Sequence, residues 1–421
     1  KEKKIKLDKK KNWLLQLNLN KLIKEILSFL LSFFYSEKKK YVFASSRLSI
    51  IQILKIRFLL PGKIYFEPSF DYTISHGYND SMRDFNLEIQ KSDTEFEKII
   101  KYLIPLWIPK SFIESFFDLK NEKKNLKKLP EKINVIFSAN YHFNNDLFKI
   151  WSADQIDKGA KLVCGQHGGG PFHRYNGGQD FELGISDLLA STGNGNTSYK
   201  QVRDVGQFFS RLKLNQFKPS GPAMIVSTLM PRYVFDLRSM ALGNQMKDYF
   251  EEQFYFYENL PKDIKKKTFI RFPLPHKIGD YGWNLYGRWK KRFPEVTIQD
   301  STLPFEQSVK SCRLLIHTYS ATTFCQSLAA NIPTIMFWNI KHWELKKYTS
   351  EDMNLLKSVN IFHETAESAS HHMKYIWNDI SKWWLSPSVQ EARKLFCRKY
   401  ANSDKFVEKR LANVLKEVEN I

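Results

Sequence analysis

Short hydrophobic runs alternate with amphipathic stretches along most of this 421-residue chain. The clearest case begins at residues 133–138, an apolar run that predicts a buried strand. Residues 145–158 follow, with apolar side chains at helical spacing. Gly159 ends this predicted helix, and a second apolar run occupies residues 161–165. A strand, a helix and a strand in this order predict a βαβ unit with parallel strands.

The same alternation returns after residue 222, while residues 193–222 are richer in Gly, Asn, Ser and Lys and indicate a linker. The two runs predict an α/β fold with two Rossmann-type domains facing across a cleft, followed by a helical C-terminal tail. Further strands are predicted at residues 41–44, 223–227, 268–272, 296–298, 314–318 and 333–338. Helices are predicted at residues 237–256, 306–312, 321–330 and from 366 onward, and residues 85–130 are predicted to be largely helical.

The composition narrows the classes of partner. A hydrophobic content of 43% and an aromatic content of 15% support packed interiors and argue against disorder. The net charge of +21 favours anionic partners such as nucleic acid, anionic lipid or phosphorylated small molecules. No zinc-finger spacing or RNA-recognition motif favours nucleic acid. The four cysteines lack metal or redox spacing, which indicates reduced thiols in a cytosolic protein.

Residues 1–40 combine charge with an apolar stretch. They hold twelve lysines and four acids, and residues 26–35 are apolar but too short to span a bilayer. Such a segment is compatible with binding to an anionic membrane surface. The alternative is a first helix that packs on the domain behind a solvated run of lysines.

A glycine-rich loop follows the strand predicted at residues 161–165. It reads Gln166, His167, Gly168, Gly169 and Gly170. Glycines after a strand allow a sharp turn and a close approach to a ligand, and histidine exchanges protons near neutral pH. Ligands of α/β sheets bind at this edge, where the strands end. The alternative is a tight turn with a structural histidine.

A turn rich in hydroxyl groups lies between the strand predicted at 314–318 and the helix at 321–330. It carries Ser320, Thr322 and Thr323. Backbone N–H groups at a helix start, together with the helix dipole, favour an anion such as phosphate. The alternative is ordinary capping of the helix by a serine or threonine side chain.

Cations follow two strands of the second predicted domain. Arg271 stands at the end of one strand, with His276 and Lys277 shortly after it, and Arg232 follows the preceding strand. Cations beyond the carboxyl ends of parallel strands face the ligand crevice, so these residues are candidate phosphate ligands. Surface arginines on loops are the alternative.

Two acids, Glu182 and Asp187, follow the His-Gly loop. Either is a candidate general base or a partner that orients His167, and a solvated acid is the alternative. The sequence has no obvious Asp-x-Asp pair, so no catalytic metal is predicted.

Several motifs together resemble those of a family of transferases associated with bacterial surface-polysaccharide genes. The resemblance covers roughly residues 130–401 and is specific only in combination, and we place no resemblance on the first 130 residues. It implies a GT-B fold. The residues that carry it are Trp151-Ser152-Ala153, Gly159-Ala160-Lys161-Leu162, Gln166-His167-Gly168-Gly169, His317 to Thr323, Leu328 to Ile335, Trp383-Trp384, Val389 to Arg393 and Phe396.

More distantly, the His-Gly loop is similar to that of polyol-phosphate transferases and of capsule transferases that use CMP-activated keto-sugar acids. By that similarity His167 would lie near the reacting hydroxyl, and residues 320–323 near the donor phosphates. Many GT-B transferases hold the donor ribose with a glutamate in the following helix. Here the nearest candidate is the neutral Gln326, so the donor nucleotide is left open.

The resulting hypothesis is a cytosolic GT-B glycosyltransferase, peripheral at the inner membrane face. It would transfer a sugar from a nucleotide donor, CMP-linked in one reading, to a glycan or lipid-linked acceptor at the cell surface, with no resident cofactor, metal or nucleic acid. A polyol-phosphate transferase, a nucleotide-sugar epimerase and a non-catalytic glycan- or lipid-binding scaffold are the alternatives. The expected segments are residues 1–40 as a basic helical segment, 41–200 as the acceptor-side domain, 201–365 as the donor-binding domain and 366–421 as helices packing back on the first domain.

Overall fold

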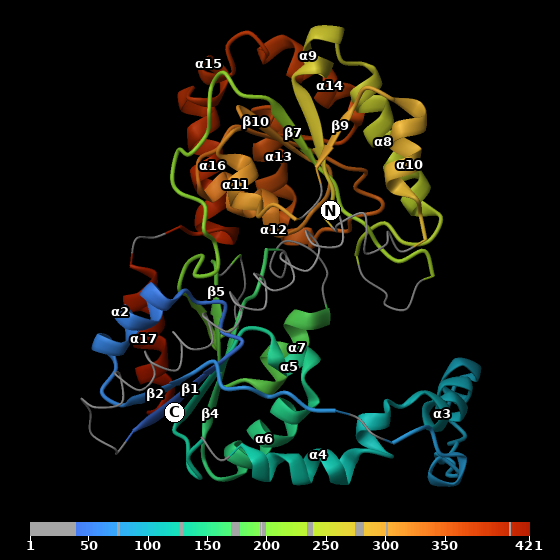
Figure 1. Cartoon of the computed structure of the whole chain (residues 1–421), viewed down its shortest axis with the longest axis vertical. Helices are drawn as coiled ribbons and strands as arrows, with labels where there is room; N and C mark the ends of the chain where they lie inside the picture. The colour runs from blue at the N-terminus through green and yellow to red at the C-terminus, as the bar shows by residue number, and fades with distance from the viewer. Residues whose placement is uncertain are drawn as a thin grey trace, which may run out of the picture. The chain divides into compact units, whose positions relative to one another are not determined.

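The structure is a computed structural model that describes residues 39–73, 76–126, 129–169, 177–193, 195, 199–233, 239–273, 282–299, 302–403 and 406–421 (Figure 1). Two six-stranded parallel sheets form its framework, in the orders β2-β1-β3-β4-β5-β6 and β12-β11-β10-β7-β8-β9. The predicted α/β fold, with two separate parallel sheets, is therefore confirmed. The chain divides into two compact units, one ending at Gly165 and including Leu415–Ile421, the other Gln166–Val414.

The first sheet and its helices occupy the N-terminal half of the chain. The strands are β1 (Lys40–Ala44), β2 (Lys63–Phe66), β3 (Val135–Ser138), β4 (Lys161–Gly165), β5 (Leu188–Ser191) and β6 (Val202–Asp204). The helices are α2 (Ile50–Leu59), η1 (Asp80–Met82), α3 (Glu95–Trp107), η2 (Lys110–Phe112), α4 (Phe116–Glu122), η3 (Lys123–Asn125), α5 (Tyr141–Asn144), α6 (Asp146–Asp157) and α7 (Gly177–Ile185).

The second sheet alternates with helices in the same way. The strands are β7 (Ala223–Val226), β8 (Thr268–Arg271), β9 (Thr297–Gln299), β10 (Leu314–His317), β11 (Thr334–Phe337) and β12 (Phe362–His363). The helices are α8 (Gln245–Glu258), α9 (Lys262–Lys266), α10 (Leu285–Arg292), α11 (Phe305–Val309), α12 (Thr322–Ala329), η4 (Lys347–Thr349), α13 (Ser350–Ser358), α14 (Ala366–Ile376), α15 (Ile380–Trp384), α16 (Pro387–Tyr400) and α17 (Val407–Val418).

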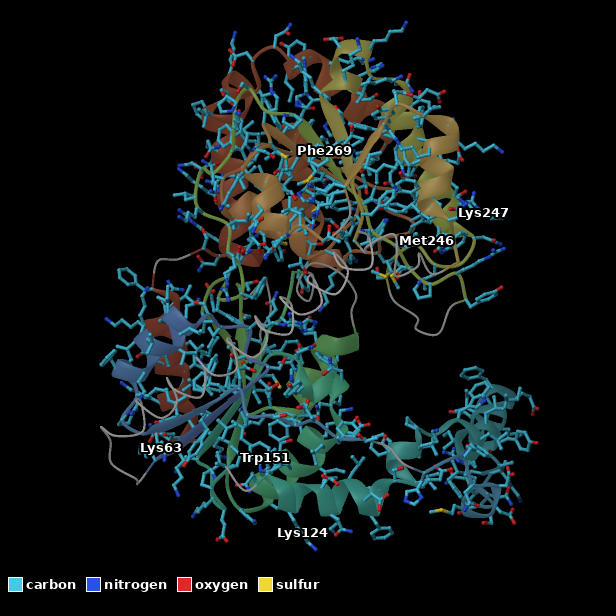
Figure 2. All side chains as sticks on the ribbon, viewed as in Figure 1. Lys63, Lys124, Trp151, Met246, Lys247 and Phe269 are labelled. Carbon is cyan, nitrogen blue, oxygen red and sulfur yellow. The ribbon has the colours of Figure 1, made fainter. Side chains whose placement is uncertain are left out.

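Helix α6 shows how the local sequence sets an element. It begins where the Asn145 side chain accepts a hydrogen bond from the Phe148 amide at 2.8 Å, and Gly159 follows its end with φ at +93°. Trp151 packs its ring against Phe70 at 5.1 Å between centroids, inside the first unit (Figure 2). The predicted helix and its glycine stop are confirmed.

Helix α8 begins later than the sequence predicts. The helix expected over residues 237–256 is wrong for residues 239–244, because Gly243 takes a left-handed φ of +50° and the helix begins after it, at Gln245. Residues 237 and 238 lie outside the described residues. Left-handed backbone is easiest for glycine and interrupts a right-handed helix. Four short strands, β2, β5, β6 and β12, were also missed, since runs of two to four residues carry little periodicity.

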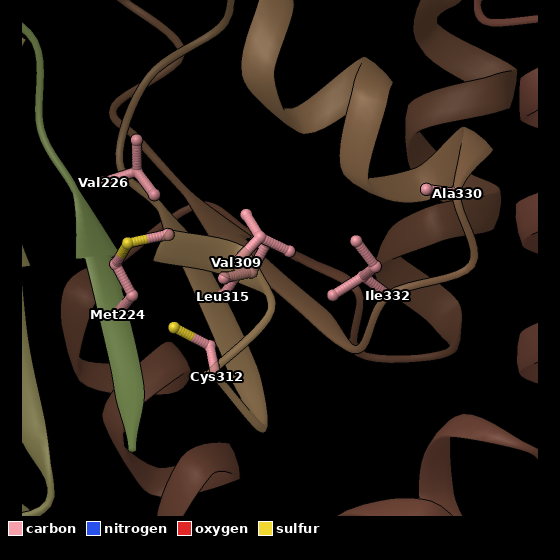
Figure 3. Close-up of a cluster of buried hydrophobic side chains, with 7 residues drawn as sticks. All are labelled: Met224, Val226, Val309, Cys312, Leu315, Ala330 and Ile332. Atoms are coloured by element: carbon pink, nitrogen blue, oxygen red, sulfur yellow. The ribbon is translucent and has the colours of Figure 1, made fainter. Parts of the chain in front are cut away.

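The core of the second unit packs β7 and β10 against α11 and the turns beside it. Figure 3 shows this cluster of buried side chains, which close over one face of the sheet. Its members are Met224, Val226, Val309, Cys312, Leu315, Ala330 and Ile332.

The C-terminal residues contact both units, α16 the second and Glu419 the first. Arg393 of α16 donates to the Leu328 carbonyl of α12 at 2.7 Å, so α16 is bound to the second unit. Glu419 accepts hydrogen bonds from the Tyr41 hydroxyl and the Lys39 ammonium, both at 2.5 Å, in the first unit. The predicted segment boundaries, the cleft and the roles of the two domains stay predictions.

Candidate active site

The His-Gly loop leaves β4 at Gln166, whose side chain fixes the loop from inside. Gln166 is buried, and its amide donates to the Gly168 carbonyl at 2.5 Å and accepts from the Thr192 amide at 3.0 Å. Its backbone N–H bonds to the Ala190 carbonyl of β5 at 2.8 Å. The side chain of His167 is exposed. The loop thus presents its histidine outward from a hydrogen-bonded base, while the predicted Gly170 lies outside the described residues.

The two described glycines of the loop lie directly on the start of α12. The Gly169 amide donates to the Thr322 hydroxyl at 3.1 Å. A Cβ at Gly168 would lie 2.5 Å from the Thr322 hydroxyl oxygen, and one at Gly169 would lie 2.9 Å from Cys325 Sγ and 3.1 Å from the Ala321 carbonyl. Only glycine permits this approach. Two motifs that the sequence shows separately are therefore in contact.

The start of α12 has no capping side chain. Its N-cap is Ala321, in extended backbone, which offers no side-chain acceptor. Capping by serine or threonine was the alternative to a phosphate site, and this helix does not use it at the N-cap. Ser320 is fully buried just before the helix, and Thr322 and Thr323 are half-buried in its first turn. The N-terminal end of a helix dipole, without a capping acceptor, suits an anion.

A neutral histidine fixes the orientation of this turn. His317 is fully buried at the end of β10 and contacts the hydroxyls of Ser327 at 3.0 Å and Thr323 at 3.2 Å through its two ring nitrogens. Burial lowers the pKa of the His317 imidazole to about 3. The Thr323 hydroxyl also lies 3.0 Å from the Tyr319 hydroxyl. The network ties β10, the turn and α12 together without a charge.

Tyr249 of α8 joins the ends of two strands beside this turn. Its hydroxyl lies 2.7 Å from the Thr318 hydroxyl and accepts from the Thr228 amide at 2.9 Å. Thr318 in turn donates to the Val226 carbonyl at 3.0 Å. Burial raises the pKa of the Tyr249 phenol well above its ordinary value. Sequence reasoning missed Tyr249 and His317 as positioning residues, because neither carries a local signal for this role.

The predicted cations lie in different surroundings. Arg271 is buried, and its guanidinium donates to Gln299 at 3.2 Å, to the Ser308 hydroxyl at 3.1 Å and to the Leu303 carbonyl at 2.7 Å. It holds the segment after β9 against α11. Arg232 is exposed, with its guanidinium 5.9 Å from the Trp283 ring.

The convergence of these cations on one pocket stays a prediction. His276 and Lys277 lie outside the described residues. Gln326, the proposed counterpart of a ribose-binding glutamate, is buried within α12.

The two candidate acids sit on or next to α7. Glu182 is buried in α7, and Asp187 is half-buried in the turn before β5. Lys346 joins the same helix from the segment after β11, since its ammonium donates to the Gln179 side chain at 2.7 Å. Burial lowers the pKa of Lys346, and nearby Asp180 opposes that shift. Lys346 is a cation that the sequence did not single out.

Among the described residues, no group of three His, Cys, Asp or Glu side chains could hold a metal ion. The roles of all candidate site residues stay predictions, because no ligand contact tests them.

The solved structures that this chain resembles are distant. S. aureus MnaA solved with UDP has a TM-score of 0.47 and 9% identity, covering 91% of this chain and 97% of that one. Anabaena Alr3699/HepE solved with UDP has a TM-score of 0.44 and 9% identity, covering 90% and 100%. Acinetobacter baumannii MurG has a TM-score of 0.40 and 9% identity, covering 91% and 100%.

A search of curated proteins found no match. The family model of the LIC12162 family transferases matches residues 1–415, so the resemblance expected over residues 130–401 also includes the first 130 residues, and the chain belongs to this family of transferases.

Proposed function

We propose that this transferase moves a sugar from a nucleotide-activated donor to a glycan or lipid-linked acceptor of the cell surface. The observation that carries the proposal is the contact between Gly169 and Thr322. It brings a proton-transferring loop to the start of a helix suited to phosphate. Both halves of a glycosyl transfer, deprotonation of an acceptor and departure of a nucleotide, then have groups in one place.

The start of α12 would receive the donor diphosphate or phosphate. The N-terminal N–H groups of α12 would donate to its oxygens, Ser320 and Thr323 would fix the turn that presents those groups, and Arg232, His276 and Lys277 would add positive charge. Arg271 would not contact the phosphate itself but would position the segment after β9. Charge developing on the leaving phosphate would be stabilised by these fixed dipoles and cations.

His167 would act as the general base. Its ring nitrogen takes the proton from the acceptor hydroxyl as the oxygen attacks the anomeric carbon, and the bond to the donor phosphate breaks with its electron pair leaving on the nucleotide. Its exposed position lets an acceptor approach. Glu182 and Asp187 are the rival bases or the groups that orient the imidazole.

The neutral side chain of Gln326 limits how strongly the ribose of the donor nucleotide can be held. A neutral amide can pair with ribose hydroxyls but offers no charge to strengthen that contact. We infer that the donor is held mainly through its phosphates and base, which is compatible with a CMP-linked sugar.

The place of work would be the inner face of the membrane. The basic residues 1–40 would favour an anionic surface, although residues 1–38 of that segment lie outside the described residues. The acceptor would then be presented at that surface.

The decisive experiment offers the purified chain a panel of UDP-, GDP-, dTDP- and CMP-sugars and measures binding by calorimetry and donor turnover by mass spectrometry. We expect one nucleotide class to bind and its sugar to be released or transferred. Turnover of CDP-polyols instead would indicate a polyol-phosphate transferase. Conversion to an epimeric nucleotide sugar would indicate an epimerase. Failure to bind any nucleotide would leave a scaffold and overturn the proposal.

A further inference from the structure

In the segment between β2 and β3, large hydrophobic side chains lie on the surface and charged side chains lie inside, the reverse of an ordinary globular domain. Among the described residues, thirty large hydrophobic side chains are exposed, and fourteen of them lie between Tyr78 and Phe117. Among the described residues between Phe70 and Leu119, no large hydrophobic side chain is buried. A solvated protein rarely concentrates apolar surface in this way unless another body covers it.

Helix α3 carries the centre of this surface. Phe96, Ile99 and Trp107 are 70%, 56% and 72% exposed. Viewed down the helix axis, at about 100° per residue, the exposed apolar side chains occupy one arc of about 200°, with Tyr102 at one edge and Ile104 at the other. The apolar arc faces away from the protein, which is the opposite of an ordinary amphipathic helix.

The inner side of α3 is polar instead. Arg83 forms a two-pronged ion pair with Glu114, with N···O distances of 2.6 and 2.7 Å, and both side chains are at most 2% exposed. The same guanidinium donates to the carbonyls of Pro105 at 3.0 Å and Ile108 at 2.9 Å, at the end of α3. Lys101 donates to the Glu88 carbonyl at 2.9 Å. A buried ion pair adds little net stability by itself, so the polar interior of this segment does not replace a hydrophobic core, and its exposed apolar side chains gain free energy if they are removed from water.

We propose that α3 inserts into the interfacial layer of a lipid bilayer. A second copy of the chain would cover one face of the helix, whereas lipid can surround an arc of this width. The helix has thirteen residues, about 20 Å at 1.5 Å per residue, which is too short to cross the apolar core of a bilayer. No helix of the described residues is long and apolar enough to span one. It would therefore lie in the interface, where Tyr102 and Trp107 are favoured.

The attraction would be mainly apolar. Residues 76–126 hold one arginine and seven lysines against nine acids, so the segment is nearly neutral. The net charge of +21 would orient the whole chain to an anionic leaflet, and α3 would add contact that salt does not screen. In one respect this rests on the proposed function, since a lipid-linked acceptor requires the enzyme to work at a bilayer.

The first test places a fluorophore on α3 in the full chain. The four native cysteines are buried, so Ile99→Cys can be labelled selectively with an environment-sensitive dye. Tyr375→Cys on α14, where Tyr375 is 87% exposed, is the matched control. With vesicles of phosphatidylglycerol and phosphatidylethanolamine we expect a blue shift and quenching by brominated lipid at residue 99 only. Both should persist in about 0.5 M salt, where charge attraction is screened.

The second test removes the apolar face. Phe96→Glu, Ile99→Glu and Trp107→Glu together should lower vesicle binding in high salt at least about tenfold. Glutamate at the exposed Leu214, Tyr375 and Leu385 together should leave it unchanged.

Two outcomes would overturn the proposal. If the spectrum of the dye at residue 99 changes with protein concentration in the absence of vesicles, a second copy of the chain covers the surface. If the spectrum changes neither with protein concentration nor with vesicles, α3 stays in water. Donor turnover in vesicle-free solution keeps the two proposals apart. It should be equal in the α3 variant and the wild type, and its absence in both would count against the proposed function alone.

Discussion

Single residues set how closely the His-Gly loop approaches α12. Gly169 lies where a Cβ would meet Cys325 Sγ at 2.9 Å and backbone atoms of Ala321 and Thr322 at 3.1 Å. Gly184, on α7, has nothing within 4 Å of an added Cβ. The same substitution at these two positions therefore separates the contact from the general effect of losing a glycine.

Gly169→Ala should push the loop away from α12. We expect a loss of about 1–3 kcal/mol in the free energy of unfolding, as for other overpacked sites, and a clear fall in turnover. Gly184→Ala should be neutral or slightly stabilising, because alanine favours a helix. Urea denaturation and the donor assay measure both. Equal turnover in the two variants would show that the contact does not matter for activity.

His167→Ala should lower turnover by about a hundredfold to ten-thousandfold, the usual range for loss of a general base. Its side chain is exposed, so nucleotide affinity and the melting temperature should hardly change. Glu182→Gln is the comparison, since Glu182 is buried and the amide keeps its shape. Near-normal turnover in His167→Ala with an inactive Glu182→Gln would move the assignment to the carboxylate.

At the scale of an element, the uncapped start of α12 is the feature to test. Ala321→Asp places a capping carboxylate where the donor phosphate is proposed to bind. Helix stability should rise by about 0.5–2 kcal/mol, while nucleotide affinity should fall at least about tenfold through repulsion. Chemical denaturation and calorimetry read the two effects independently. A stabilised variant that binds nucleotide normally would remove the phosphate from this helix.

At the scale of the molecule, buried histidines should make the fold sensitive to acid. Burial lowers the pKa of His317 to about 3 and the pKa values of His363 and His372 to about 4, from an ordinary 6.5. The unfolded chain therefore binds protons below pH 6.5 that the folded chain refuses, and stability falls as the pH drops from 6.5 toward 3–4.

One carboxyl opposes this trend. Burial raises the pKa of Glu252 to about 7, so between pH 7 and 4.5 the folded chain holds one proton more than the unfolded chain. Below pH 6.5 the unfolded chain gains three histidine protons, whereas the folded chain keeps one extra proton on the glutamate, so the unfolded chain binds about two protons more. The free energy of unfolding then falls by up to about 1.4 kcal/mol per pH unit for each of these protons. Urea unfolding at pH 7.5 and 5.5 measures this slope, which His363→Gln should reduce. Equal stabilities at the two pH values would contradict it.

Local patterns in the sequence determined the fold class, since alternating apolar and helical periods need only neighbouring residues. They also located the His-Gly loop and the hydroxyl turn, because glycines after a strand and hydroxyls before a helix have local meaning. The start of α8 was misplaced because the left-handed turn at Gly243 competes with the helical period.

Only the tertiary structure decided what these motifs do together. Gly169 and Thr322 are 153 residues apart in sequence, and no local pattern encodes their hydrogen bond. Arg271 could be placed at a strand end from sequence, yet its partners Gln299 and Ser308 come from other elements. The reversed polarity around α3 was equally hidden, because hydrophobic periodicity shows that a helix has an apolar face but not whether that face meets the protein. Contacts between distant segments depend on how the chain packs as a whole, and packing is not a property of any single stretch.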